Sequence, residues 1–269
     1  MTELAQDAAP GTFAALHRGP RPLLLPNAWD VSSALAFVAA GFAAVGTTSF
    51  GVNAAQGRPD GAGSSRDATR DLVHRLRALP VHVTADIEDG FSDDPSEVAS
   101  FVEELAIAGI NIEDSQNGRL VEPAVLAAKI GAIKQRAPSV FVNARVDTYW
   151  FGIDATPEAT VDRAKAYVDA GADGVFVPGA AAPGILQRLA ASIPVPVNVL
   201  VTPALTLAQL GDLGVRRVST GSLPYRAAID AAVSVAESVR DGGLAPSATP
   251  YGQMQERLEE YARQFGTQS

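Results

Sequence analysis

The chain has 269 residues, 47% of them hydrophobic, and a net charge of −9 at pH 7. This length and apolar content suffice for a large core in one domain, and the acidic balance argues against nucleic acids and anionic membranes as partners. The chain contains no cysteine, which excludes disulfides, zinc–thiolate sites and thiol catalysis, and it shows neither a signal peptide nor a membrane-length apolar run, so we expect a cytoplasmic protein.

Eight short runs rich in β-branched residues and leucine recur along the chain, and we predict that each is a strand. They are residues 22–25, 43–47, 81–86, 110–113, 140–144, 174–177, 195–200 and 217–220. Amphipathic segments lie between them, notably 31–40, 97–108, 123–136, 157–170, 183–191 and 225–241. Eight such units predict an α/β fold, the (β/α)8 TIM barrel. A doubly wound sheet is the competing interpretation, but the glycine-rich phosphate loop that it would need is absent.

Two segments lie outside the repeat. Residues 1–18 are predicted to form a short capping helix, which together with the barrel makes a domain of residues 1–241. Residues 242–269 comprise a linker rich in Gly, Pro and Ser and a final helix at about 252–265, which we expect to pack on a neighbouring subunit. The long glycine-containing loop at 51–65 is expected to form a lid or a wall of the site.

Acidic residues follow the third and fourth predicted strands. The strand period of two puts Asp86 and Glu88 on one face, as two oxygen ligands of a hard cation require. Glu113 ends the neighbouring strand and would complete the carboxylate set, whereas Asp89 alternates to the other face. Magnesium suits such an all-oxygen site, with manganese as the alternative, and zinc would prefer histidine or cysteine. The competing interpretation is that one of these acids caps the following turn or lies on the surface.

The positions of the other reactive side chains restrict the chemistry. The histidines are His17, His74 and His82, and the lysines are Lys129, Lys134 and Lys165. The histidines lie before the barrel, on a helix and at the start of a strand, so we expect structural roles for them. All the lysines fall inside predicted helices, which argues against a Schiff base in the barrel. A carbanion next to a carbonyl would then have to be stabilised as an enolate on a metal.

Two features at the predicted strand ends suit an anionic ligand. Arg145 ends the fifth strand, where a guanidinium can bind a carboxylate through two parallel hydrogen bonds. The alternative is a salt bridge to Asp147 or Glu113 in the rim. The segment from Thr48 through Ser49 to Phe50 offers backbone N–H groups for a second carboxylate or an oxyanion, and a simple turn is an equally good interpretation.

Six motifs taken together resemble the isocitrate lyase and phosphoenolpyruvate mutase superfamily. They occur in order over residues 22–240: LPNAWD (25–30), GTTS (46–49), GRPDG (57–61), ADIEDG (85–90), NIED (111–114) and NARVD (143–147). The resemblance implies a (β/α)8 barrel that exchanges its terminal helix between subunits of a homodimer or homotetramer. It also implies a magnesium ion and a 2-oxo or 2-hydroxy carboxylate substrate that passes through an enolate.

The resemblance also implies roles for individual residues. By motif, Asp86 is the direct metal ligand, and Glu88, Glu113 and Asp60 hold metal-bound waters. We expect Asp60, Glu113 and Arg145 to be the catalytic residues. Arg145 clamps the substrate carboxylate. The backbone of Thr48, Ser49 and Phe50 would bind the other end of the substrate, and Asn198 would line the pocket. Glu88 stands where aspartate is more usual, which lengthens that arm by one methylene.

The chain departs from the superfamily pattern after the Glu113-Asp114 pair. The lyases carry a loop there whose cysteine acts as an acid, whereas residues 115–120 of this chain read Ser-Gln-Asn-Gly-Arg-Leu. Phosphonopyruvate-processing members carry a gating loop that is longer by about ten residues. Asn117 or Arg119 would have to replace part of such a gate.

The leading hypothesis from the sequence is a magnesium-dependent lyase for a small 2-oxo or 2-hydroxy (di)carboxylate. It would act by C–C cleavage or decarboxylation through a metal-bound enolate. The alternatives are a mutase or hydrolase of the phosphonopyruvate type, and a protein that binds a 2-oxo acid such as 2-oxoglutarate with little turnover.

Overall fold

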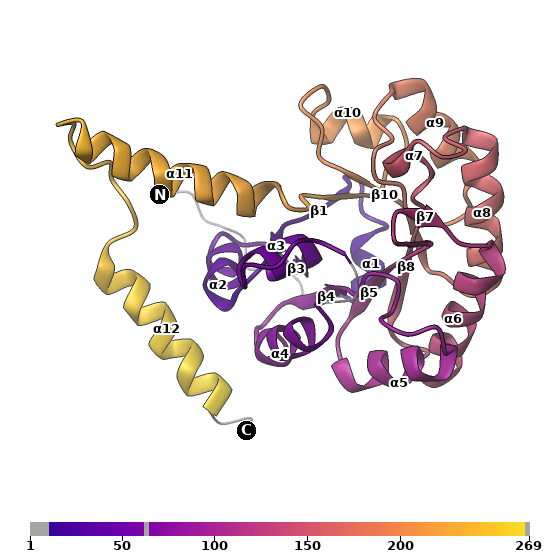
Figure 1. Ribbon diagram of the computed structural model, residues 1–269, viewed down its shortest axis with the longest axis horizontal. Coiled ribbons are helices and arrows are strands. Elements are labelled where there is room, and N and C mark those ends of the chain that lie inside the picture. Colours follow the sequence, from indigo (N-terminus) through magenta and orange to yellow (C-terminus); the bar gives the residue numbers. More distant parts are fainter. Residues whose placement is uncertain (1–10, 62–64, 267–269) are drawn as a thin grey trace.

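All eight predicted strands form in the computed structural model, which describes residues 11–61 and 65–266. They are β1 (Leu23–Leu25) with its continuation β2 (Asn27–Ala28), β3 (Ala44–Thr47), β4 (His82–Asp86), β5 (Gly109–Glu113), β8 (Phe141–Arg145), β9 (Gly174–Phe176), β10 (Val197–Leu200) and β11 (Arg217–Ser219). All neighbours in this sheet pair in parallel, in the order β1-β11-β10-β9-β8-β5-β4-β3-β2. Because β1 and β2 are successive pieces of one strand, the ends of the sheet meet. The predicted TIM barrel is confirmed (Figure 1).

Helices alternate with the strands, and most of them surround the barrel (Figure 1). They are α1 (Phe13–Leu16), α2 (Val31–Ala39), α3 (Ser49–Ala54), α4 (Arg66–Leu76), α5 (Pro95–Leu105), α6 (Pro123–Arg136), α7 (Thr148–Phe151), α8 (Pro157–Asp169), α9 (Pro183–Ser192), α10 (Leu207–Asp212), α11 (Leu223–Arg240) and α12 (Tyr251–Gly266). A two-stranded hairpin, β6 (Ser115–Gln116) and β7 (Arg119–Leu120), follows β5. None of the helices within the described residues is long and apolar enough to cross a membrane.

Capping side chains explain where the observed boundaries differ from the predicted ones. Helix α5 starts at Pro95, before the predicted residue 97, because the Asp94 side chain caps it by accepting a hydrogen bond from Ser96 N at 2.8 Å. It stops at Leu105, short of the predicted residue 108, because Ala106 adopts a left-handed conformation with φ of 50°.

The barrel interior is unusually polar at mid-height. The Asn111 side-chain oxygen, Oδ1, accepts hydrogen bonds from Asn143 Nδ2 at 2.9 Å and from Arg217 Nη2 at 3.1 Å. Arg217 Nε also donates to Ser219 Oγ at 3.3 Å. Arg217 is fully buried, and no described carboxylate lies within salt-bridge distance of it. Burial lowers the pKa of Arg217 to about 9, although attraction to Asp86 opposes the shift.

The described part of the predicted N-terminal helix closes the barrel at the amino ends of its strands. Only Phe13–Leu16 is helical, and residues 1–10 lie outside the described residues. The Phe13 ring packs on Phe141, the first residue of β8, with ring centroids 5.4 Å apart. His17 stacks on the same ring at 4.3 Å, and its Nδ1 donates to the Phe13 carbonyl at 3.0 Å. The expected structural role of His17 is therefore consistent with its place in the core.

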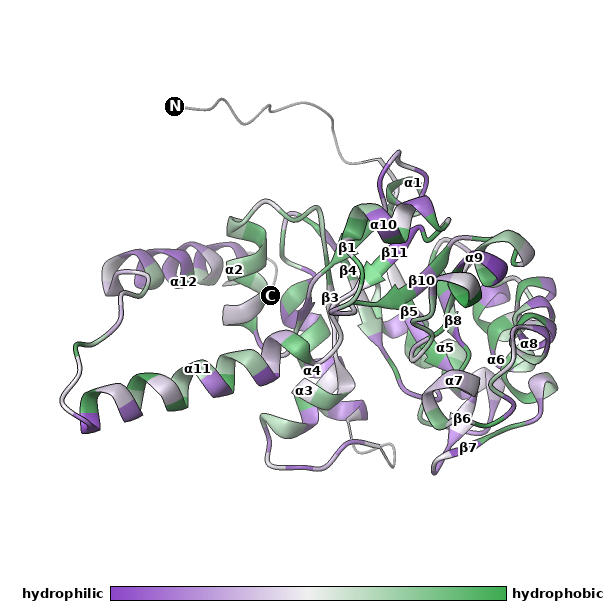
Figure 2. Cartoon of the chain, turned by 90° about the horizontal axis from the view of Figure 1, so that it is seen from above, coloured by the Kyte–Doolittle hydropathy of each residue, from purple (hydrophilic) through white to green (hydrophobic). Residues whose placement is uncertain are grey.

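The two C-terminal helices lie away from the barrel (Figures 1 and 2). None of the 18 residues of α11 is buried, although several are large and apolar. After the irregular linker, α12 turns back toward α4. There, Tyr261 Oη donates to the Arg75 carbonyl at 3.2 Å, and the Phe265 ring lies 5.9 Å from the His74 ring. The predicted linker and final helix are both present.

The buried histidine under the barrel predicts a pH-dependent stability. Burial, with the charge of Arg217 acting in the same direction, lowers the pKa of His17 to about 4 from an unfolded value of 6.5. Between these values the unfolded chain binds more protons, so stability falls as the pH falls through this range. His17 should contribute a loss of about 2 kcal/mol in the free energy of unfolding between pH 7 and pH 5.

Urea denaturation at both pH values gives the change in unfolding free energy between pH 7 and pH 5. The contribution of His17 is the amount by which this change is larger in the wild type than in His17→Phe. The exposed His74 provides the matched control, since His74→Gln should keep the wild-type pH dependence. Equal pH dependence in the wild type and His17→Phe would contradict the prediction.

Candidate active site

A cavity of about 820 Å³ opens at the carboxyl ends of the strands, where TIM barrels place their active sites. It is lined by Ser49, Asp60, Gly61, Glu88, Asp89, Phe91, Ser92, Asp93, Glu113, Ser115, Gln116, Asn117, Gly118, Arg145, Trp150 and Phe151. Five of these side chains are carboxylates, and Arg145 is the one cation among them. The cavity therefore brings together Ser49, Asp60, Glu88, Glu113 and Arg145 from the predicted site.

Asp86 ends β4 beside this cavity, and α3 holds its carboxylate in place. Ser49, the first residue of α3, donates to Asp86 Oδ2 through its backbone N at 3.2 Å and through its hydroxyl at 2.9 Å. The Asp86 backbone N donates to Thr47 Oγ1 at 3.0 Å. A carboxylate at a helix N-terminus with these donors is both stabilised and fixed in direction.

The start of α3 differs from the predicted anion-binding turn. Its residues form a helix, and the Ser49 N–H binds Asp86 instead of remaining available for a ligand. Thr48 is buried and does not line the cavity. Phe50 does not line it either, and its ring lies 6.0 Å from that of Tyr225 in α11. Direct substrate contacts from Thr48 and Phe50 remain predictions.

A left-handed turn follows Asp86 and positions Glu88. Glu88 has φ of 51°, and its backbone N lies 3.4 Å from Asp86 Oδ1. Its carboxylate accepts a hydrogen bond from the Ser65 hydroxyl. Gly90 has φ of 98°, and a Cβ there would lie 2.8 Å from Val98 Cγ1, so glycine is required at this position. Gly90 of the ADIEDG motif is therefore a structural requirement of the turn, whereas the acidic residues of the motif supply carboxylates.

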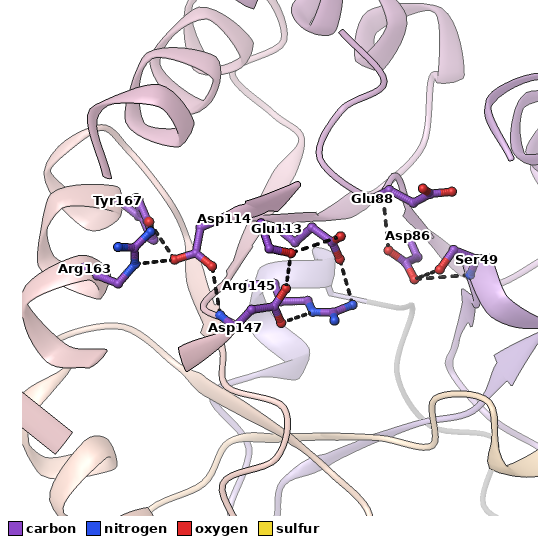
Figure 3. A network of polar contacts seen from close by, with 10 residues as sticks. Ser49, Asp86, Glu88, Glu113, Asp114, Arg145, Asp147, Arg163 and Tyr167 are labelled. Carbon is purple, nitrogen blue, oxygen red and sulfur yellow. Dashed lines mark hydrogen bonds and ion pairs between the residues drawn. The ribbon is translucent and has the colours of Figure 1, made fainter. Parts of the chain in front are cut away.

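An ion triad forms the opposite side of the site (Figure 3). Arg145 Nη1 lies 2.9 Å from Glu113 Oε2, and Arg145 Nε donates to Asp147 Oδ1 at 2.7 Å. Asp147 also accepts a hydrogen bond from Ser115 Oγ at 2.6 Å. The rim salt bridges that the sequence left as an alternative role for Arg145 are thus both present. Because Nη2 makes no hydrogen bond to a described residue, a carboxylate-binding role remains open to the same side chain.

Asp114 anchors the triad to the helical layer. Its Oδ1 accepts from the Asp147 backbone N at 2.8 Å. Its Oδ2 accepts from Arg163 Nε at 2.6 Å and from Tyr167 Oη at 2.8 Å, both on α8. The position of Asp147, and through it that of Arg145, is therefore fixed by buried contacts on two sides.

Burial, together with the crowding of carboxylates, raises proton affinity in the cavity. Burial raises the pKa of Glu113 to about 8. The attraction of Arg145 opposes this shift, and repulsion from Asp147, Asp86 and Glu88 adds to it. Asp60 remains largely exposed on the loop before α4, yet partial loss of solvation and repulsion from Asp86 raise its pKa as well. Such shifts mark sites that gain from a bound cation.

This arrangement fits a divalent metal ion that has one carboxylate as a direct ligand. Among the described residues, no three His, Cys, Asp or Glu side chains are placed to bind one ion together. Asp86, Glu88 and Glu113 therefore do not form a closed set of direct ligands. Magnesium usually keeps several waters and takes only one or two carboxylates. An all-oxygen site with Asp86 as its fixed ligand fits that preference.

The segment after Asp114 is a tight hairpin. Asn117 and Gly118 have φ of 49° and 74°, the positive values of a two-residue turn between β6 and β7. Gln116 Nε2 donates to Asp89 Oδ2 and to Asp93 Oδ1, at 2.8 Å each, and so ties the hairpin to the turn after β4. Asn117 lines the cavity, whereas Arg119 does not. This hairpin was not predicted from the sequence, although an Asn-Gly pair between two short strands is its usual signal.

Asn198 lies inside the barrel and does not line the cavity. It is 1% exposed, and its Oδ1 accepts from Ser219 Oγ at 3.1 Å. Its contact with the substrate stays a prediction. Lys129 and Lys134 lie on α6 and Lys165 on α8, as predicted, and Lys129 Nζ donates to the Asp89 carbonyl at 2.8 Å.

Comparison with known proteins identifies the family. The model of the phosphoenolpyruvate phosphomutase family matches residues 13–240. An uncharacterized protein of Mycobacterium tuberculosis is 54% identical, over 95% of this chain and 99% of that protein. A 2-methylisocitrate lyase of Bacillus subtilis is 33% identical, over 71% of this chain and 67% of the lyase.

Among solved structures, a phosphonopyruvate hydrolase in complex with oxalate and Mg²⁺ superimposes with a TM-score of 0.79. It is 25% identical, and the match covers 93% of this chain and 96% of the hydrolase. The chain therefore belongs to the phosphoenolpyruvate phosphomutase family and is an enzyme of the isocitrate lyase and phosphoenolpyruvate mutase superfamily.

Proposed function

We propose that this enzyme is a magnesium-dependent lyase that cleaves a carbon–carbon bond in a small 2-oxo or 2-hydroxy carboxylate through an enolate. The observation that carries the proposal is one cavity with a helix-held Asp86 on one side and Arg145 on the other. The relationship to 2-methylisocitrate lyase supports the reaction class, and the hydrolase complex with oxalate and Mg²⁺ supports the metal and the type of ligand.

The acidic residues around Asp86 would bind the ion in two ways, directly and through water. Asp86 would bind it directly, since Ser49 fixes the direction of the carboxylate. Glu88, Glu113 and Asp60 would hold it through water molecules. When bound, the ion supplies Lewis acidity that lowers the energy of negative charge developing on an oxygen of the substrate.

Arg145 would orient the substrate. Its guanidinium is held rigidly by Glu113 and Asp147, and its free Nη2 can donate to a substrate carboxylate. No lysine amine is available to form an enamine, since the three lysines lie on helices α6 and α8. The charge of the carbanion would therefore be stabilised electrostatically and not covalently.

Helix α11 supports assembly into a homodimer or homotetramer with exchanged helices. The sequence places the exchanged helix after the linker, but α11, which precedes the linker, already projects from the barrel (Figure 1). Its exposed apolar side chains are Leu223, Ile229, Val233, Val235 and Val239. A helix that exposes such a surface without burying any residue is best explained by a second copy of the chain covering it.

Substitution of Asp86 tests the metal site. In Asp86→Asn the shape is kept and the anionic ligand is lost, so magnesium affinity, and with it Mg²⁺-dependent release of pyruvate or a related 2-oxo acid, should fall by about 100-fold. Calorimetry of Mg²⁺ binding in the presence of oxalate and turnover of a panel of 2-hydroxy and 2-oxo acids measure both effects. The matched control is Asp162→Asn on the exposed face of α8. Wild-type magnesium affinity in Asp86→Asn would refute the assignment.

A double-mutant cycle distinguishes the role of Arg145 in stability from its role in binding the substrate carboxylate. Arg145→Gln leaves two buried carboxylates without their cation and should cost about 3 kcal/mol of unfolding free energy. Adding Glu113→Gln should recover part of that stability, because it removes one uncompensated charge. Oxalate binding should remain lost in both variants.

Urea denaturation and calorimetry follow the two properties independently, with Glu113→Gln completing the cycle. If Arg145→Gln binds oxalate as well as the wild type does, Arg145 serves the fold alone.

Charged substitutions on the apolar surface of α11 test whether this helix mediates assembly of the oligomer. The double variant Ile229→Asp with Val233→Asp should convert the oligomer to monomer, because burying two carboxylates in an apolar interface is costly. Light scattering after size-exclusion chromatography gives the mass. Ser234→Asp adds one carboxylate, half the charge of the double variant, to the same helix at a polar position and should leave the oligomer intact. A monomeric wild type would rule out the exchange.

A further inference from the structure

We propose that the substrate carries a single carboxylate and that its far end is an uncharged alkyl or aryl group. The substrate class would then be 2-oxo monocarboxylates with an apolar tail, not dicarboxylates. The tail-bearing carbon C4 would carry a hydroxyl group, because cleavage of the C3–C4 bond leaves its electron pair as the enolate while the 4-hydroxyl loses its proton and C4 departs as an aldehyde bearing the tail. This inference rests on the proposed function, because it assumes that the ion beside Asp86 and Arg145 hold the first carboxylate.

The charge of the cavity disfavours a second carboxylate on the ligand. Its lining holds Asp60, Glu88, Asp89, Asp93 and Glu113 against one cation, Arg145. A divalent ion would be coordinated by Asp86 and by the oxygens at the carboxylate end of the substrate. No second positive charge then remains on the described walls for a carboxylate at the far end.

Three cations near the cavity, Arg145, Lys129 and Arg163, are already engaged. Arg145 has two of its three nitrogens in ion pairs, so its guanidinium can clamp one carboxylate at most. Lys129 Nζ donates a hydrogen bond to the Asp89 carbonyl, and Arg163 Nε donates one to the Asp114 carboxylate. Neither of these side chains lines the cavity. A second carboxylate would have to approach Asp89 and Asp93, which already share the Gln116 amide.

Phe91, Trp150 and Phe151 form an aromatic wall of the cavity. All three rings line the cavity, and Trp150 and Phe151 are 52% and 38% exposed. Exposed aromatic rings inside a concave site are the usual receptors for an apolar ligand group. The short helix α7 presents Trp150 and Phe151 together and ends at Gly152, whose φ of 66° suits glycine.

The clamp and this wall are close enough for one small molecule to touch both. The Arg145 guanidinium lies 5.6 Å from the centre of the Trp150 ring. A ligand whose carboxylate binds Arg145 therefore brings its next carbon atoms toward Trp150. An alkyl or aryl tail would cover the ring, whereas a charged tail would have to give up its hydration there.

A ligand panel tests the inference on the full-length enzyme with Mg²⁺. Calorimetry should show that 2-oxohexanoate and 2-oxo-4-phenylbutanoate bind at least tenfold more tightly than 2-oxoglutarate. In Trp150→Ala, the ratio of the affinity for 2-oxo-4-phenylbutanoate to that for oxalate should fall about tenfold. Circular dichroism establishes that the variant is folded.

A gain-of-charge variant gives an independent test. Asp93→Lys places a cation at the rim and should raise the affinity for 2-oxoglutarate about tenfold relative to 2-oxohexanoate. Asp162→Lys makes the same charge change on α8, remote from the cavity, and should leave this ratio as in the wild type.

Oxalate separates the two proposals. If oxalate with Mg²⁺ fails to bind to the wild type, the proposed function itself falls. If oxalate binds and 2-oxoglutarate binds as tightly as 2-oxohexanoate or more tightly, only the inference about the tail is overturned.

Discussion

The site depends on the burial of Arg145 between Glu113 and Asp147. Glu113 and Arg145 are register partners at the carboxyl ends of β5 and β8, so the pairing of the strands itself brings their side chains together. Asp147 completes the triad and is tied through Asp114 to α8. Buried ion pairs of this kind contribute little net stability, since desolvation offsets attraction. What this one provides is a guanidinium of fixed position facing the cavity.

A second buried arginine balances charge from inside the barrel. Arg217 has no carboxylate partner within reach among the described residues, but its charge attracts Asp86. Asn111 and Ser219 satisfy two of its nitrogens at mid-barrel. A lone cation in a core is costly, and here it lies below a cavity whose lining is strongly negative. The polar barrel interior and the acidic cavity therefore offset one another electrostatically.

The strand positions could be predicted because each of the eight apolar runs marks a buried segment. The backbone conformations of the site residues could not be predicted, because a hydrophobic pattern contains no information about them. The strand period was used to place Asp86 and Glu88 on one face, but β4 ends at Asp86 and Glu88 lies in a left-handed turn. The two residues come together through that turn and not through strand alternation. Helix α3 was missed because six residues are too few to show a helical period.

The hairpin that replaces the superfamily's loop changes how water can be kept from the reaction. Gln116 anchors β6 to Asp89 and Asp93, so this wall is held to the barrel by two hydrogen bonds and differs from a long loop that closes over the substrate. Reactive enolates require exclusion of water. When the rim of the cavity is fixed, the enolate has to be shielded from water by the ligand itself and by the rings of Trp150 and Phe151. An apolar tail packed against these rings would do this, which links the selectivity of the cavity to the protection of its intermediate.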